Sequence, residues 1–166
     1  MRRIFLFIAV LMFVMSSAAV ADVEIAGHKV TDANYAGTRG LGIGIIFGET
    51  NGLSVKNWVN ANQAFQFDIN WDLYYAGLGI GAAYLFHNFE MMTSDMNKFP
   101  VYFGIKGWAS FSTGGTAAGV QVPLGIAWIP KETPVDIFLE VCPGISLIPS
   151  VRFAPGGGLG IRYWLN

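Results

Sequence analysis

Hydrophobic and polar residues alternate along most of the chain, and the segment QAFQFDINWD at 63–72 shows this pattern without a break. From Phe65 to Trp71 the odd positions carry large apolar side chains, while the even positions from Gln66 to Asp72 carry polar ones. A β-strand places successive side chains on opposite faces, so the segment predicts a strand with one apolar and one polar face. The function depends on which of these faces points to the inside of the fold.

The same alternation recurs after residue 22, and no stretch there keeps a helical period, so the pattern predicts an all-β fold. Turn-forming residues such as glycine, proline and asparagine separate the alternating segments. Regularly spaced strands with short connections favour an antiparallel meander, and closing it into a barrel removes its edges. The eight predicted strands are about 39–48, 53–60, 64–72, 74–88, 100–112, 117–129, 135–148 and 151–165, with a longer connection at 89–99.

Odd and even positions in these strands separate two kinds of side chain. One face carries the large apolar residues of each strand, and the other carries glycine runs at 40–44, 77–81 and 158–160. The glycine-bearing face also holds five aromatic residues, which are Trp58, Tyr102, Trp108, Phe138 and Trp164. It holds the charges well inside the strands, which are Lys56, Asp68, Lys106, Asp136, Glu140, Arg152 and Arg162.

Volume decides which face is inside. The interior of an eight-stranded barrel is only just wide enough for its own side chains, so it cannot hold the large apolar face. That face therefore points outward, as a belt larger than the apolar patches that soluble monomers expose. We predict an eight-stranded antiparallel up-and-down transmembrane β-barrel with outer-membrane lipids around it. Four aromatic residues near strand ends match the interfacial girdles of such barrels, and they are Trp71, Tyr74, Trp128 and Tyr163.

The inward charges need partners, because an unpaired charge in a narrow interior has a large desolvation cost. A turn at 61–63 would place Lys56 directly opposite Asp68. A turn at about 149–151 would place Asp136 opposite Trp164, with Arg162 as its diagonal neighbour. Glu140 would face Gly158 or Gly160 and reach across the interior toward Lys106 or an arginine. These pairs predict a plugged, structural interior rather than a conduction path.

The first 21 residues have the pattern of a cleaved signal peptide. Arg2 and Arg3 precede a twelve-residue apolar run, and Ala19-Val20-Ala21 matches a cleavage site. We expect export by the ordinary secretory route and a chain that continues with a polar lead-in at 22–38 and a barrel domain at 39–166. The expected location is the bacterial outer membrane.

Composition excludes several other kinds of site. Charged residues make up 13% of the chain and aromatic residues 14%, and no basic patch suggests nucleic acid. Cys142 is the single cysteine, so the chain can form no internal disulfide. With His28 and His87 scattered along the chain, we expect no metal site and no cofactor.

We expect a structural or interaction role without catalysis, and four other hypotheses remain as alternatives. Asp136 and Glu140 share one strand face, which is a possible geometry for general acid–base hydrolysis. His87 would be the residue to consider in an outer-membrane lipid hydrolase, although it points inward and lacks a nearby serine. A narrow pore for small solutes or ions, and a soluble periplasmic barrel that binds an apolar ligand, are the remaining alternatives.

Several motifs resemble a small bacterial outer-membrane β-barrel family of unestablished role, known from spirochaetes and other diderm bacteria. They include G-L-S-x-K-x-W near 52–58, P-L-G-[IL]-A near 123–127, [IF]-F-L-E-x-x-P-G near 137–144 and G-[IL]-G-I-R-Y near 158–163. The likeness covers about 38–165 and implies an OmpA- or OmpX-like eight-stranded barrel, inserted by the barrel-assembly machinery. It implies no catalytic residues.

Overall fold

The computed structural model describes residues 40–49, 51–60, 62–72, 77–89, 97–130 and 133–165, all of which belong to one compact unit spanning 32–166. The predicted signal peptide and polar lead-in lie outside the described residues. The described part contains no helix that is long and apolar enough to cross a membrane.

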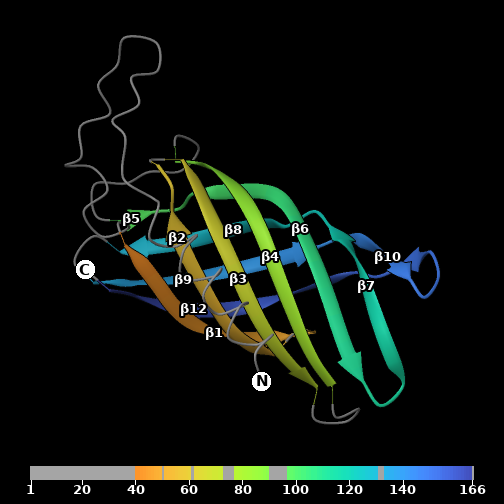
Figure 1. Ribbon diagram of the computed structural model, residues 1–166. Coiled ribbons are helices and arrows are strands. Elements are labelled where there is room, and N and C mark those ends of the chain that lie inside the picture. Colours follow the sequence, from red (N-terminus) through yellow and green to blue (C-terminus); the bar gives the residue numbers. More distant parts are fainter. Residues whose placement is uncertain are drawn as a thin grey trace. The chain divides into compact units, whose positions relative to one another are not determined.

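Every regular element of the described chain is a β-strand (Figure 1). The strands are β1 (Leu41–Gly48), β2 (Gly52–Trp58), β3 (Gln63–Asp72), β4 (Gly77–Asn88), β5 (Asn97–Lys98), β6 (Val101–Ser112), β7 (Gly115–Gln121), β8 (Leu124–Pro130), β9 (Val135–Cys142), β10 (Gly144–Ile148), β11 (Arg152–Phe153) and β12 (Gly156–Leu165). All pairings between them are antiparallel.

Three of the eight predicted strands are each divided in two. Pro123 separates β7 from β8, Pro143 separates β9 from β10, and Pro155 lies between β11 and β12. Proline lacks the N–H group that a ladder needs, so the regular pairing stops there. The proline carbonyls still accept hydrogen bonds from neighbouring strands, at 3.0 Å for Gly104 N to Pro123 O and 2.8 Å for Val122 N to Pro143 O.

The barrel closes between the first and last strands. β1 pairs with β12 from Leu41 opposite Leu165 to Gly48 opposite Gly158, and β6 pairs with both β7 and β8. Counting each divided strand once, the described chain is an eight-stranded closed antiparallel barrel, which confirms the predicted all-β fold with eight antiparallel strands. That the barrel spans a membrane stays a prediction. The short strand β5 was not predicted. It lies in the expected 89–99 connection and pairs with the end of β8.

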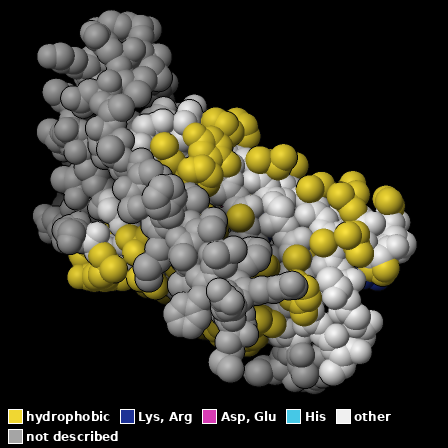
Figure 2. Space-filling model, in the orientation of Figure 1, with side chains coloured by type: hydrophobic (Ala, Val, Ile, Leu, Met, Phe, Trp, Pro, Cys, Tyr) yellow, Lys and Arg dark blue, Asp and Glu magenta, His cyan; other side chains and the backbone are white. Residues whose placement is uncertain are grey.

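The large apolar side chains lie on the outside of the barrel, as predicted. Figure 2 shows hydrophobic side chains spread over the visible face of the strands. Eight outward residues from five strands are each exposed by more than half, and they are Phe47, Leu78, Phe103, Ile105, Leu139, Val141, Leu159 and Tyr163. We call the outward apolar residues of the strands the apolar belt.

Two predicted strand registers are wrong by two residues. Lys56 lies opposite Gln66, and Asp68 lies opposite Ser54. The β2–β3 turn closes earlier than expected, because Val59 N donates to Gln63 O at 2.9 Å and Asn60 Nδ2 donates to the Gln63 side chain at 2.9 Å.

The second wrong register joins β9 and β12. Asp136 lies directly opposite Arg162, where a pairing with Trp164 was expected. The chain reverses between Ile148 and Arg152 with its centre one residue earlier than expected, and the register of β10 with β11 continues unchanged into β9 and β12. This earlier reversal makes Arg162 the direct cross-strand partner of Asp136.

The two ends of the barrel differ. At the end where β1 begins and β12 finishes, which we call the closed end, aromatic side chains fill the interior: the Trp58 ring lies 5.8 Å from Phe89 and 6.2 Å from Trp164, between ring centroids. At the other end, which carries the β1–β2, β6–β7 and β10–β11 turns, a cavity of about 510 Å³ opens to the surface. We call this end the open end and the cavity the end pocket.

Candidate functional site

The middle of the barrel holds a connected cluster of buried polar side chains, which we call the charge network. Its first part joins β3 to β6, where Lys106 Nζ lies 2.6 Å from Asp68 Oδ2. The amide of Gln66, two residues before Asp68, donates to the same carboxylate at 3.3 and 3.4 Å. Both charges are buried, so the short contact offsets the cost of removing them from water.

Arg162 on β12 is the centre of the second part. Its Nη2 donates to Gln66 Oε1 at 2.6 Å and to Ser54 Oγ at 3.1 Å, and its Nε donates to the same serine at 3.2 Å. Its Nη1 lies 3.6 Å from Asp136 Oδ2, which is an ion-pair distance rather than a hydrogen bond. The guanidinium carbon lies 3.6 Å from the centroid of the Phe138 ring, a cation–π contact.

Glu140 on β9 lies opposite Gly158, one of the two glycines expected to face it. Its Oε2 accepts a hydrogen bond from the Tyr102 hydroxyl at 3.0 Å and a longer contact from Gln66 Nε2 at 3.5 Å, while its Oε1 accepts from the Cys142 thiol at 3.2 Å. The expected direct partners, Lys106 or an arginine, are thus replaced by neutral donors. Glu140 reaches the rest of the network through Gln66.

Lys56 occupies a separate place toward the closed end. Its Nζ lies 2.7 Å from His87 Nε2, and it stands 5.0 Å from the Trp58 ring and 4.8 Å from the Tyr102 ring, between Nζ and centroid. The predicted pair of Lys56 with Asp68 is wrong, since Lys106 holds that carboxylate. The aromatic faces and the imidazole nitrogen replace a carboxylate as the partners of Lys56 Nζ.

Six of the seven charges predicted to face inward are buried, and one is not. Lys56, Asp68, Lys106, Asp136, Glu140 and Arg162 are all at most 4% exposed. Arg152 is exposed on β11, at the wall of the end pocket, so it lies outside the charge network. The formal charges of these six buried residues balance, with three bases and three acids.

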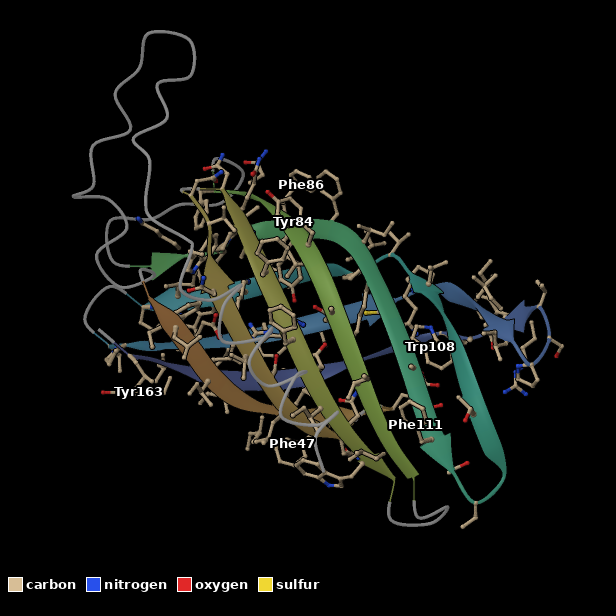
Figure 3. The ribbon with its side chains drawn as sticks, viewed as in Figure 1. Phe47, Tyr84, Phe86, Trp108, Phe111 and Tyr163 are labelled. Carbon is tan, nitrogen blue, oxygen red and sulfur yellow. The ribbon has the colours of Figure 1, made fainter. Side chains whose placement is uncertain are left out.

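Three of the four predicted girdle aromatics lie on the outside of the barrel. Trp71 is near the open end, while Trp128 and Tyr163 are near the closed end, and Tyr74 lies outside the described residues. Figure 3 shows the same division among other aromatic residues, with Tyr84 and Phe86 toward one end and Phe47 and Phe111 toward the other. Their place in a membrane interface stays a prediction.

The sequence reasoning missed the residue that joins the network. Gln66 contacts Arg162, Asp68 and Glu140, and the Ser54 hydroxyl accepts twice from Arg162. Both side chains are uncharged, whereas the members of the interior cluster predicted from the sequence are all charged. The signal was present, because Gln66 shares the polar face of the 63–72 segment with Asp68.

The end pocket is a cavity large enough for a small molecule. The Lys106 side chain and Gln121 contribute to its wall from deep in the barrel, and Glu49 and Arg152 contribute from the turns. The described residues contain no group of three or more histidine, cysteine, aspartate or glutamate side chains placed to hold a metal ion.

No protein-family model, curated protein or solved structure matches this chain. What is established is the fold and its interior, an eight-stranded closed β-barrel with buried charge pairs. The resemblance to the small outer-membrane barrel family stays a prediction.

Proposed function

We propose that this chain is a transmembrane β-barrel of the bacterial outer membrane with a plugged interior, and that its role is structural or interaction-related without catalysis. The observation that carries the proposal is the apolar belt around a closed barrel whose charges are buried inside. Water disfavours such a belt on a monomer, whereas hydrocarbon chains match it.

The plugged interior rests on packing. Phe138, Trp164 and Arg162 are among the largest fully buried side chains, and all three project into the barrel. Trp58, His87 and Tyr102 fill the closed end with ring contacts between 4.4 and 5.0 Å. A continuous water path through these side chains would require breaking the packing and the charge network together.

The proposed location and partners follow from the same surface. Outer-membrane lipids would contact the apolar belt, and the barrel-assembly machinery would insert the strands, as the resemblance to the small outer-membrane barrel family implies. The turns at the open end are short, with Gly48 and Gly52 only four residues apart, so long loops that grasp a partner are lacking among the described turns there.

A charge placed on the belt tests the membrane proposal. Leu139 lies in the middle of β9 and is 53% exposed, so Leu139→Arg would have little effect in water, within about 0.5 kcal/mol of unfolding free energy. In a bilayer the same change should cost about 2–4 kcal/mol near the midplane. The measurement is urea unfolding of the protein in phospholipid vesicles.

Val151→Arg is the matched control, since Val151 is 74% exposed in the turn between β10 and β11, where a bilayer tolerates charge. Extraction of the wild-type protein without detergent, or equal stability of both variants in vesicles, would contradict the proposal and favour a soluble barrel. Heat-modifiable migration on a gel verifies that each variant has folded.

Planar-bilayer recording tests the plug. We expect no steady ohmic current from the wild-type protein, because the closed end is filled by aromatic side chains. A steady current proportional to voltage would replace the plugged interior by the narrow-pore alternative, while leaving the membrane proposal intact.

A further inference from the structure

The end pocket has the size of a ligand site. Its volume of about 510 Å³ falls within the roughly 300–1,000 Å³ typical of small-molecule sites. Its wall extends from the turns of the open end to Lys106, at the edge of the charge network. A solute could therefore enter from one end and stop at the network.

The described wall of the pocket offers groups that both donate and accept hydrogen bonds. Amide and hydroxyl side chains line it, and they are Asn51, Asn70, Ser110, Ser112 and Gln121. Trp108 on β6, labelled in Figure 3, adds an indole ring. Such a combination suits a molecule with many hydroxyl groups and an apolar ring face.

Two wall residues have buried polar atoms without a partner. Neither Asn70 Oδ1 nor Trp108 Nε1 has a hydrogen-bond partner in the described part of the chain. The first is an acceptor and the second is a donor, and a buried polar group left unpaired is costly. Both atoms are buried, so a ligand hydroxyl group, which donates and accepts, would satisfy either one after the side chain turns that atom toward the pocket.

The positive and negative side chains at the described wall of the end pocket nearly balance. The Lys106 ammonium is held by Asp68 at 2.6 Å, and Glu49 and Arg152 at the turns have opposite signs. A pocket for a phosphate or a carboxylate would instead present uncompensated cations. The wall therefore favours an uncharged ligand.

From this geometry we propose that the end pocket is a binding site for a neutral saccharide, with a sugar ring against Trp108 and its hydroxyl groups bonded to the amide and hydroxyl side chains of the wall. This inference goes beyond the proposed function and does not depend on where the barrel resides.

Gly79 offers a way to fill the pocket without disturbing the fold. It lies between Asn70 and Ser110 in the sheet, and a Cβ there would meet Asn70 Cβ at 3.5 Å, an ordinary contact. Gly79→Leu should therefore project into the pocket. Gly107→Leu is the matched control, because a Cβ at Gly107 has nothing within 4 Å and the residue is exposed on the outer face.

The experiment is titration of the purified full chain, folded in the sugar-free detergent lauryldimethylamine oxide, with glucose, galactose, N-acetylglucosamine and their disaccharides, followed by calorimetry and saturation-transfer NMR. We expect saturable binding of at least one of them. Gly79→Leu should weaken it at least tenfold, Trp108→Leu about fivefold or more, and Gly107→Leu less than twofold.

Three results would overturn the inference: no saturable binding of any saccharide, binding that Gly79→Leu leaves unchanged, or binding of inorganic phosphate or glutamate in their place. Each variant is first shown to fold by its heat-modifiable migration. The assay needs no bilayer, so its failure is distinguishable from failure of the membrane proposal, which the Leu139→Arg variant tests.

Discussion

The closed end and the open end of the barrel are built from the same alternating strands, yet one is filled and the other is hollow. Toward the closed end the inner face carries Trp58, His87, Tyr102 and Trp164, whose rings pack against one another. Toward the open end the inner face surrounds a pocket of about 510 Å³. The difference lies in the size of the inward side chains.

Strand β4 shows this gradient along a single element. Its inward positions from the open end to the closed end are Gly77, Gly79, Gly81, Ala83, Leu85 and His87. Glycine at the open end leaves space for the pocket, and at Gly81 a Cβ would meet Lys106 Cε at 2.7 Å. The barrel thus combines a packed end and an end with a pocket within one sheet.

The largest expected loss of stability comes from replacing Arg162, the arginine at the centre of the charge network. Arg162→Leu leaves Asp136 buried without its ion pair and removes the bonds to Ser54 and Gln66. We expect a loss of about 3–5 kcal/mol in unfolding free energy, measured by urea titration in detergent. Arg152→Leu, at the exposed wall of the open end, should change stability by less than about 0.5 kcal/mol. Similar losses for the two arginines would remove the distinction between the ends.

A smaller effect is expected from one hydroxyl group. Tyr102→Phe removes the 3.0 Å hydrogen bond to Glu140 and leaves a buried carboxylate oxygen with only the longer Gln66 contact. Hydrogen bonds to charged groups contribute about 1.5–3 kcal/mol, so a loss of that size should appear in the same urea titration. Tyr163→Phe, which removes an exposed hydroxyl on the outer face, is the control and should leave the midpoint unchanged. If the two variants unfold at the same urea concentration, Glu140 does not depend on Tyr102.

The smallest expected changes in stability come from replacing one glycine at each end of the barrel by alanine. At Gly125 a Cβ would overlap the Tyr102 ring, so Gly125→Ala should cost about 1–3 kcal/mol through overpacking. At Gly79 the added methyl group points into the end pocket, and Gly79→Ala should be neutral or stabilising by up to about 1 kcal/mol, because alanine has less freedom in the unfolded chain. The thermal midpoints of the two variants measure this contrast. Equal destabilisation would mean that the open end is packed as tightly as the closed end.

Strand alternation predicted the inward face correctly for six of the seven charges, with Arg152 on the short strand β11 as the exception. Burial of Asp68, Glu140 and Arg162 and exposure of Phe47 and Leu139 follow from odd and even position alone, because every side chain in a strand alternates faces. The prediction survived even where prolines divided a strand, since Val122 and Leu124 keep the same face on either side of Pro123.

The sequence was a poorer guide to which residues lie opposite each other on neighbouring strands. A shift of one residue in the centre of a turn moves every cross-strand partner by two positions, without changing which face a residue occupies. The turns after Trp58 and Ile148 are each centred one residue earlier than expected. As a result, Lys56 lies opposite Gln66 and not Asp68. Asp136 likewise lies opposite Arg162 and not Trp164. The local hydrogen bonds that set the turn after Trp58 involve residues, such as Asn60 and Gln63, whose geometry the alternation does not encode.

The sequence by itself determined that the chain forms an eight-stranded barrel with apolar residues outside and charged residues inside, because a two-residue period and side-chain volume allow only that arrangement. Only the tertiary structure decided which charges meet, that Gln66 connects them, and that one end is filled while the other holds a pocket. Those features depend on how far each side chain reaches across the interior from strands that are distant in sequence, as with Arg162 and Ser54. A pattern that repeats every two residues carries no information about that distance.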